Sequence, residues 1–182
     1  MAAGLVKVAD DEGNELPPGE VGLVFLKAPA ATKFDYFRDA DKTAGAYRGD
    51  YFTLGDMGYV DDEGYLFLTD RTADLIISGG VNIYPAEVDA VLLEHPAVGD
   101  VATIGVPDEE WGEAVLSVVQ PADGVEGNDE LAVGLMDFCR ARLAHFKCPR
   151  RVDFVSELPR EDTGKIFKRK LRQQYRAATG RG

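Results

Sequence analysis

The chain has 182 residues, of which 45% are hydrophobic, and a formal net charge of −12. This length suffices for one ordinary domain or two small ones with packed cores. The two cysteines, Cys139 and Cys148, are too few for a disulfide framework and lack CxxC spacing, so we expect reduced thiols. No apolar run is long enough to span a membrane, and the first residues lack a signal-peptide pattern. These features favour a cytoplasmic protein.

The charge is unevenly distributed along the chain. Residues 140–182 carry +9 and the remainder carries −21. An acidic body with a basic end argues against binding to duplex DNA, whereas a local basic face can receive a small polyphosphate. A solvated basic helix is the alternative interpretation of the same charges.

Residues 1–70 are predicted to be mainly β-structure. Turn residues over 10–19 precede an apolar strand at Val21–Lys27, and apolar runs at 59–60 and 65–68 flank an acidic turn that ends in glycine. These strands have few partners within the chain. The segment therefore indicates the edge of something larger.

Residues 71–182 are predicted to form a compact α+β domain with short sheets and about three helices. We place the boundary within 70–74. Pro85 in a first turn and a cap at Asn128 or Asp129 mark two of the helices. The predicted elements are strands at 75–77, 101–106, 115–119 and 152–155, and helices at 85–95, from 128 or 129 to about 143, and from about 168.

Three polar segments contain candidate functional residues. In Phe52-Thr53-Leu54-Gly55-Asp56, a carboxylate follows a glycine and can accept hydrogen bonds from a ribose diol, although an ordinary turn gives the same pattern. Arg71 offers a planar set of donors, and Gly79-Gly80 lets a backbone approach a ligand. This second segment runs from Asp70 to Gly80. Its alternative interpretation is an Arg–Asp surface pair followed by a glycine turn.

The third segment is Leu158-Pro159-Arg160-Glu161-Asp162-Thr163-Gly164-Lys165-Ile166. It predicts a polar, exposed loop between the last strand and the last helix. A flexible loop of this kind can deliver the Lys165 ammonium to a phosphate as a point charge. Taken alone, a Thr-Gly-Lys sequence is more typical of an ordinary surface lysine.

Together, the order and spacing of these segments resemble the adenylate-forming superfamily, over about Gly19 to Leu171. The stretch Ser78-Gly79-Gly80-x-Asn82-Ile83-Tyr84-Pro85-x-Glu87 is similar to the acyl-CoA synthetase (fatty-acid–CoA ligase) branch. The resemblance implies that residues 1–70 are a remnant of the large N-terminal domain. It implies that residues 71–182 are the mobile C-terminal lid domain of an AMP-forming ligase.

The resemblance also implies a reaction. A fatty or other organic acid and ATP give an acyl-adenylate and pyrophosphate; the lid then rotates, and the CoA thiol forms the thioester and releases AMP. Asp56 and Arg71 match the ribose-binding pair, and Lys165 matches the lysine that reaches the α-phosphate and the substrate carboxylate. ATP and CoA are the expected co-substrates. Mg²⁺ is expected for the full-length enzyme, with no metal ligands in this chain.

On the thioester-forming face, the resemblance assigns Ser78, Gly79 and Gly80 to a loop that lines the pantetheine tunnel. Trp111 matches a position that contacts the CoA nucleotide in some relatives, and Phe146 and Arg150 are further candidates for the CoA end. A half-buried packing role is the alternative for Trp111, because tryptophan commonly has one apolar and one wet face.

The chain departs from the family pattern at the hinge, where Ala73 stands in place of the usual Asp or Lys. A hinge needs a change of backbone torsion rather than a charge, so rotation remains compatible with alanine. The family's phosphate-binding loop and acyl pocket have no counterpart in this sequence. We therefore expect the chain alone to be inactive and to depend on an N-terminal domain. The alternatives are a non-catalytic module that binds CoA or a nucleotide, and a fragment of another adenylating enzyme.

Overall fold

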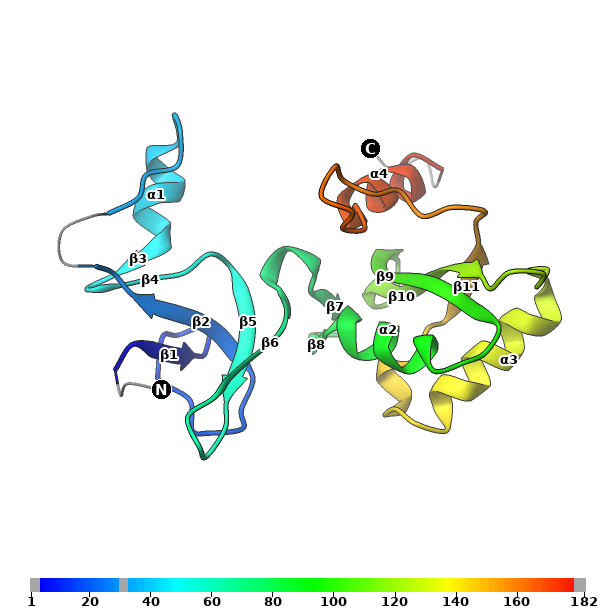
Figure 1. The fold of residues 1–182 in the computed structure, drawn as a ribbon, viewed down its shortest axis with the longest axis horizontal. Helices are drawn as coiled ribbons and strands as arrows, with labels where there is room; N and C mark the ends of the chain where they lie inside the picture. Colours follow the sequence, from blue (N-terminus) through cyan, green and yellow to red (C-terminus); the bar gives the residue numbers. More distant parts are fainter. Residues whose placement is uncertain (1–3, 30–32, 179–182) are drawn as a thin grey trace. The chain divides into compact units, whose positions relative to one another are not determined.

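The computed structural model describes residues 4–29 and 33–178 (Figure 1). The chain divides into two compact units, Met1–Ala73 and Asp74–Gly182, and this division lies inside the range 70–74 in which the sequence placed the boundary. The described residues form helices and two sheets, which confirms the predicted α+β fold class.

The described part of the first unit contains one antiparallel sheet of six strands. Its order is β3-β4-β2-β5-β6, with β1 paired to β2. Val8, Val24, Phe25 and Met57 are buried in this unit. The elements are β1 (Val6–Ala9), β2 (Gly22–Lys27), α1 (Ala40–Ala46), β3 (Tyr47–Arg48), β4 (Tyr51–Phe52), β5 (Asp56–Val60) and β6 (Leu66–Arg71).

The hairpin predicted around residues 61–64 is confirmed, since β5 and β6 pair in antiparallel fashion. The Asp61 carboxylate accepts the backbone N–H groups of Glu63 and Tyr65 at 3.0 and 2.8 Å, as expected for an aspartate turn. The resulting register sets Asp56 opposite Arg71. The turn and the register shift between Met57 and Gly58 together determine which residues meet at the far end of the hairpin.

Helix α1 and strands β3 and β4 were not predicted. The helix begins after Asp39, whose carboxylate accepts the N–H of Lys42 at 3.0 Å. Its residues are mostly small, so no apolar stripe marks it in the sequence. The strands carry Tyr47 and Phe52, whose rings lie 5.3 and 5.1 Å from that of Phe34. Contacts between aromatic side chains, rather than a local sequence pattern, therefore stabilise strands β3 and β4.

The second unit contains a five-stranded sheet in the order β11-β10-β7-β8, with β9 paired to β10. The long hairpin of β9 and β10 is antiparallel, whereas β11 runs parallel to β10. The elements are η1 (Thr72–Asp74) at the division, β7 (Ile76–Ser78), β8 (Val81–Ile83), α2 (Pro85–Leu93), β9 (Val98–Asp108), β10 (Gly112–Pro121), α3 (Asp129–Arg140), η2 (His145–Lys147), β11 (Arg151–Phe154) and α4 (Lys168–Ala178).

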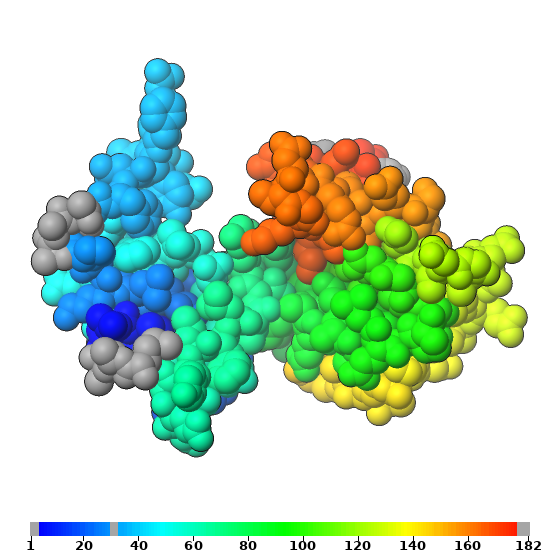
Figure 2. Space-filling view, viewed as in Figure 1, coloured from blue at the N-terminus to red at the C-terminus, as the bar shows by residue number. Residues whose placement is uncertain are grey.

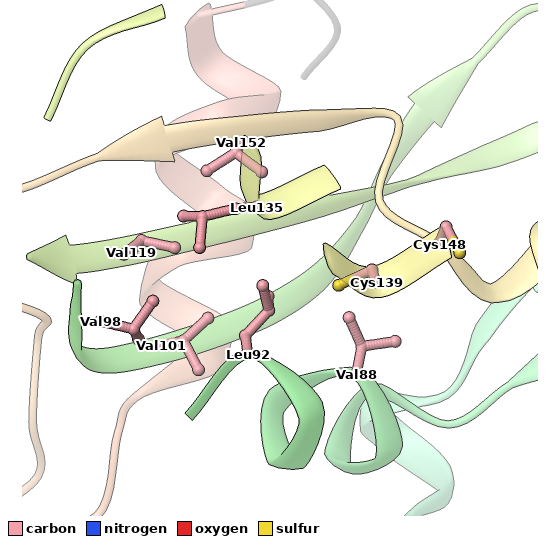
Figure 3. Packing of buried hydrophobic residues seen from close by; sticks show 9 residues of the cluster. All are labelled: Val88, Leu92, Val98, Val101, Val119, Leu135, Cys139, Cys148 and Val152. Atoms are coloured by element: carbon pink, nitrogen blue, oxygen red, sulfur yellow. The ribbon is translucent and has the colours of Figure 1, made fainter. Parts of the chain in front are cut away.

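Two hydrophobic clusters occupy the two faces of this sheet. In the first, Val101 and Val119 pack with residues of α2 and α3, including Leu92 and Leu135 (Figure 3). In the second, alternate residues of β9 and β10 pack against Leu171 of α4. Because successive side chains of a strand point to opposite faces, α2 and α3 cover one face and α4 covers the other.

A buried polar network also joins these layers. The Thr103 and Ser117 hydroxyls, both fully buried, lie 2.8 Å apart across β9 and β10. The Asp89 carboxylate of α2 accepts the N–H of Thr103 at 2.7 Å and pairs with the Lys168 ammonium of α4 at 2.9 Å. Burial raises the pKa of Asp89, and the nearby Lys168 charge opposes that rise.

Candidate functional site

Asp56 and Arg71 lie together at one end of the β5–β6 hairpin. They are cross-strand partners, and Arg71 Nε lies 3.4 Å from Asp56 Oδ1. Gly55, with a φ of 81°, turns the chain into β5, and its carbonyl accepts both the N–H and the hydroxyl of Thr72 at 2.8 and 3.0 Å. The structure therefore places a carboxylate beside a guanidinium. Arg71 is the more exposed of the two.

Ala73 lies directly after this pair, in the short 3₁₀ helix η1. The next residue, Asp74, pairs with Arg172 of α4 at 2.7 Å, and both side chains are largely buried. The start of the second unit is thereby held to its last helix. Ala73 therefore lies between two fixed residues: Thr72, which is hydrogen-bonded to the Gly55 carbonyl, and Asp74, which is paired with Arg172.

Lys165 lies in a closed turn rather than in an open loop. The Glu161 N–H donates to the Lys165 carbonyl and the Gly164 N–H donates to the Glu161 carbonyl, both at 2.8 Å. Arg160 and Ile166 form an antiparallel bridge across the turn. The Lys165 side chain is exposed, and among residues 4–29 and 33–178 its ammonium has no ion pair. The segment lies on the surface of the second unit, orange in Figure 2.

A pocket of about 480 Å³ in the second unit gathers five of the six predicted CoA residues. Gly80 is not part of its lining. The remaining lining residues were not predicted from the sequence: Val81, Val115, Arg140, His145, Cys148 and Pro149. The predicted residues that do line the pocket are Ser78, Gly79, Trp111, Phe146 and Arg150.

Two tight turns build one wall of the pocket. Gly79 and Gly80, with φ angles of 58° and 79°, join Ser78 to Val81 in the β7–β8 hairpin. Two consecutive residues of positive φ are the requirement of a two-residue hairpin turn, so Gly-Gly was the sequence signal for the missed strand β8. In this turn the glycines have a conformational role independent of any ligand.

The second turn presents Trp111 between β9 and β10. The Asp108 carboxylate accepts the N–H groups of Glu110 and Trp111 at 3.0 and 2.9 Å, and Gly112 has a φ of 78°. The Gly79 N–H donates to the Trp111 carbonyl at 2.8 Å. These bonds fix the indole against the glycine turn with 40% of the residue exposed.

The opposite part of the lining comes from residues 140–150. Arg150 is anchored by its N–H, which donates to the Val115 carbonyl at 2.9 Å, and its guanidinium lies 5.0 Å from the Trp111 ring centre. Lys147 holds the 3₁₀ helix η2 to α2 through two contacts with Glu87, at 2.7 and 2.8 Å. Phe146 of η2 is exposed.

The electrostatics of the pocket favour an anion. Arg150 and Arg140 contribute guanidinium groups, of which that of Arg140 is paired with the Asp137 carboxylate at 2.6 Å, and no Asp or Glu is among the described lining residues. The Cys148 thiol adds no charge at neutral pH, because burial raises its pKa from 9.0. A polar anionic ligand with an aromatic or apolar part therefore matches the lining.

A larger cavity, of about 580 Å³, lies in the first unit. It is formed by α1, the chain before it and Tyr47. None of the predicted site residues lines it. The larger cavity is therefore not the one in which the predicted glycine, tryptophan and arginine residues meet.

No described helix is long and apolar enough to cross a membrane. Over residues 4–29 and 33–178, no group of three or more His, Cys, Asp or Glu side chains is arranged to hold a metal ion.

Comparison with known proteins places this geometry in a family. Residues 87–165 match the AMP-binding enzyme C-terminal domain. The chain is 45% identical to 2-succinylbenzoate–CoA ligase of Geobacillus kaustophilus over 89% of its own length and 32% of that protein. It is 43% identical to the long-chain-fatty-acid–CoA ligase FadD13 of Mycobacterium tuberculosis over 94% of its own length and 33% of that protein.

Solved structures of related enzymes also match this chain over most of its length. ATP-bound MatB from Rhodopseudomonas palustris matches with a TM-score of 0.86 and 36% identity, over 95% of this chain and 34% of that one. MenE from Bacillus subtilis, in complex with an acyl-adenylate intermediate, matches with a TM-score of 0.78 over 91% of this chain and 33% of that one. Residues 87–165 thus correspond to the C-terminal domain of AMP-binding enzymes, and the chain over most of its length is similar to adenylate-forming CoA ligases. It spans about a third of the length of these relatives.

Proposed function

We propose that this chain is the C-terminal part of an ATP-dependent, AMP-forming acyl-CoA ligase. Such an enzyme joins a carboxylate to AMP with loss of pyrophosphate, and the CoA thiol then displaces AMP to give the thioester. The observation that carries the proposal is the pocket that brings Gly79, Trp111 and Arg150 together from three separate segments. These residues share no local structure, so their convergence favours a ligand over chance.

The pocket suits the nucleotide and pantetheine parts of CoA. The Trp111 indole is half exposed and offers a stacking surface for adenine, a contact that tolerates a polar surround. Arg150 supplies positive charge for phosphates, and Arg140 adds a guanidinium that also pairs with Asp137. Gly79 lets the Trp111 indole pack directly on the glycine turn, because a Cβ at residue 79 would lie 2.5 Å from Cε3 of the indole.

The first unit supports a role in nucleotide binding. The Asp56 carboxylate can accept the two hydroxyls of a ribose, and the adjacent Arg71 keeps donors directed to the same place. The related MatB from Rhodopseudomonas palustris was solved with ATP bound, which favours ATP as the nucleotide here. Mg²⁺ would accompany ATP in the complete enzyme, held mainly by the phosphates and by residues outside this chain.

Lys165 is proposed as the catalytic cation of the adenylation step. Negative charge gathers on the phosphoryl oxygens in the transition state, and an ammonium placed there stabilises that state more than the ground state. The exposed position of Lys165 lets it enter a site formed by another domain. Rotation about Ala73 would exchange the Lys165 turn for the CoA pocket between the two half-reactions.

We further propose that the thiol that accepts the acyl group belongs to free CoA and not to a carrier protein. One relative, 43% identical, is named as a fatty acid–[acyl-carrier-protein] ligase, ScoC, of Streptomyces coeruleorubidus. Free CoA differs from a carrier protein because it offers an adenine and nucleotide phosphates. The pairing of Trp111 with Arg150 favours CoA, because these side chains match those two groups.

CoA binding to the 182-residue protein tests the proposal directly. Trp111 is the only tryptophan of the chain, so its fluorescence reports on the pocket alone. We expect CoA to change this fluorescence saturably, with calorimetry giving the same affinity, and pantetheine to bind more weakly. Arg150→Gln should weaken binding, while Arg142→Gln, an exposed arginine outside the pocket, should not. Absence of saturable binding at millimolar CoA contradicts the proposed pocket.

Catalysis needs the missing part of the ligase. We define the hybrid ligase as the segment of the Geobacillus kaustophilus enzyme that precedes the matched region, joined to this chain. The hybrid should form 2-succinylbenzoyl-CoA, whereas the chain alone should release no pyrophosphate from ATP and acid. Turnover by the chain alone would show that the composite active site is wrong. CoA binding without hybrid activity would favour a non-catalytic binding module.

A further inference from the structure

The guanidinium of Arg160 connects the Lys165 turn to the central sheet. Its Nη2 pairs with Oδ2 of Asp100 on β9, and its Nη1 donates to the Gly164 carbonyl at 2.8 Å. Oδ1 of Asp100 accepts the N–H of Val101 at 2.8 Å, so the carboxylate is itself fixed to its strand. One planar side chain therefore bridges the sheet and the residue before Lys165.

The position of this bond matters because the Gly164 carbonyl belongs to the peptide group that leads into Lys165. The carbonyl on the other side of the Lys165 Cα accepts the N–H of Glu161 at 2.8 Å. Both peptide planes around Lys165 are thus held. Since two fixed planes determine the backbone torsions between them, they also determine the direction of the Cα–Cβ bond.

We propose that Arg160 and Asp100 are positioning residues that aim the Lys165 side chain. The proposal rests on the function proposed above for Lys165. A flexible lysine loses conformational entropy when its ammonium is placed on a phosphate, and a fixed Cβ direction reduces the number of orientations to be lost. Arginine suits the task because its fork can serve a carboxylate and a carbonyl together.

The competing interpretation is a surface ion pair without consequence for catalysis, since exposed pairs contribute little to stability. Arg142 provides a matched control. Its side chain is 42% exposed, as is that of Arg160, and it also contacts a carboxylate, Glu94, and a carbonyl, that of Phe138. It lies just beyond α3, which ends at Arg140, and not at the Lys165 turn.

The first test is amide hydrogen exchange on the 182-residue protein. In Arg160→Gln, the Glu161 and Gly164 amides should exchange roughly tenfold faster, the size expected for loss of one charge-assisted hydrogen bond. Arg142→Gln should leave both rates unchanged. Asp100→Asn should show the same effect in smaller measure, because the amide keeps an acceptor but loses the charge. Unchanged turn amides in both variants would reject the ordering role.

The second test separates the half-reactions in the hybrid ligase. Arg160→Gln should lower acid-dependent pyrophosphate–ATP exchange roughly tenfold through kcat, with KM for ATP little changed. Thioester formation from preformed acyl-adenylate should be unaffected, which a merely destabilised domain would not show. Asp100→Asn should give the same selectivity, and Arg142→Gln should lower neither half-reaction.

Two results overturn the positioning role, and they are distinguishable. If Lys165→Ala selectively lowers adenylation but Arg160→Gln does not, only the positioning role is wrong. If Lys165→Ala has no selective effect, the proposed role of Lys165 fails and the positioning role fails with it. The exchange measurement then still decides whether Arg160 orders the turn.

Discussion

Gly79 and Trp111 are in direct contact through both backbone and side chain. The Gly79 N–H donates to the Trp111 carbonyl at 2.8 Å, and a Cβ on Gly79 would lie 2.5 Å from Cε3 of the indole. That separation is far shorter than a van der Waals contact between carbon atoms. The position of the indole in the pocket therefore depends on the absence of a side chain at residue 79.

This contact predicts that Gly79→Ala displaces Trp111 and weakens CoA binding. Stacking of a base on an aromatic side chain is worth about 1–3 kcal/mol, so its loss should weaken affinity roughly tenfold or more. Titration of the Trp111 fluorescence with CoA measures the change. The free variant should already show an altered emission maximum, because the environment of the indole has changed.

Gly80→Ala is the matched control for this substitution. Gly80 also has a positive φ, 79°, but an added Cβ would meet nothing within 4 Å. Both variants should lose about 1–2 kcal/mol of folding stability, the cost of a left-handed alanine. Gly79→Ala should lose more, because its Cβ also overlaps the indole. Only Gly79→Ala should lose CoA affinity. Equal losses of affinity would mean that the hairpin backbone, and not the indole, determines binding.

Lys165→Ala in the hybrid ligase should lower adenylation by about 10²–10³-fold, the usual effect of removing one transition-state charge partner. Thioester formation from preformed acyl-adenylate should change little. Pyrophosphate–ATP exchange and single-turnover thioester formation measure the two steps separately. Lys170→Ala, an exposed lysine of α4, is the control. Equal loss in both half-reactions would contradict a role confined to adenylation.

The sequence predicted those elements whose pattern is local. The helix beginning at Pro85, the long β-strands and the β5–β6 hairpin all have periodicity or turn residues that fix them. Strand β8 was not predicted because it is only three residues long. Helix α1 was not predicted because most of its residues are small. For β8 the local signal was the Gly79-Gly80 turn, across which the strand pairs with β7, whereas α1 has no apolar stripe to mark it.

The candidate site was likewise predicted only in part from the sequence. The resemblance supplied Gly79, Trp111 and Arg150 separately, and only the pairing of Gly112 with Ser78 explains how their turns meet. Arg140 lines the pocket from the end of α3, where its sequence context is that of any surface arginine. Nothing local distinguishes it. The proximity of residues that only the tertiary structure brings together therefore could not be predicted from the local sequence.

The Asp89–Lys168 pair should make removal of one partner costlier than removal of both. Asp89→Asn keeps the acceptor for the Thr103 N–H but leaves the Lys168 ammonium, largely buried, without its charge partner. We expect a loss of about 3 kcal/mol in the free energy of unfolding, the low end for a broken buried ion pair. Adding Lys168→Met should recover part of that loss. Urea denaturation of the single and double variants provides the measurement.

Lys168→Met alone should give a pH-dependent loss. The pKa of Asp89 is already raised by burial, and it should rise further without the opposing charge. A carboxyl with a raised folded pKa holds its proton longer when folded. Stability relative to the wild type should therefore fall as pH rises above the unfolded value of about 3.9. A loss that is independent of pH would show that Lys168 acts by packing alone.

The buried thiols should make the protein less stable in alkali. Burial raises the pKa of Cys139 from 9.0 to about 11, so between these values the unfolded chain releases a proton that the folded chain retains. The free energy of unfolding should consequently fall by about 1.4 kcal/mol per pH unit in this window, and the contribution is intact below it.

Cys139→Ala isolates this contribution to the alkaline loss. The pKa of Tyr175 is raised to about 12 from 10.0, so its own effect begins only above that lower value. Urea unfolding at several pH values between about 8.5 and 10 should therefore show a shallower decline for Cys139→Ala than for the wild type. The variant itself is less stable at every pH, because it leaves a small cavity between α2 and α3 (Figure 3). Parallel curves for the two proteins would mean that the Cys139 thiol titrates normally in the folded state.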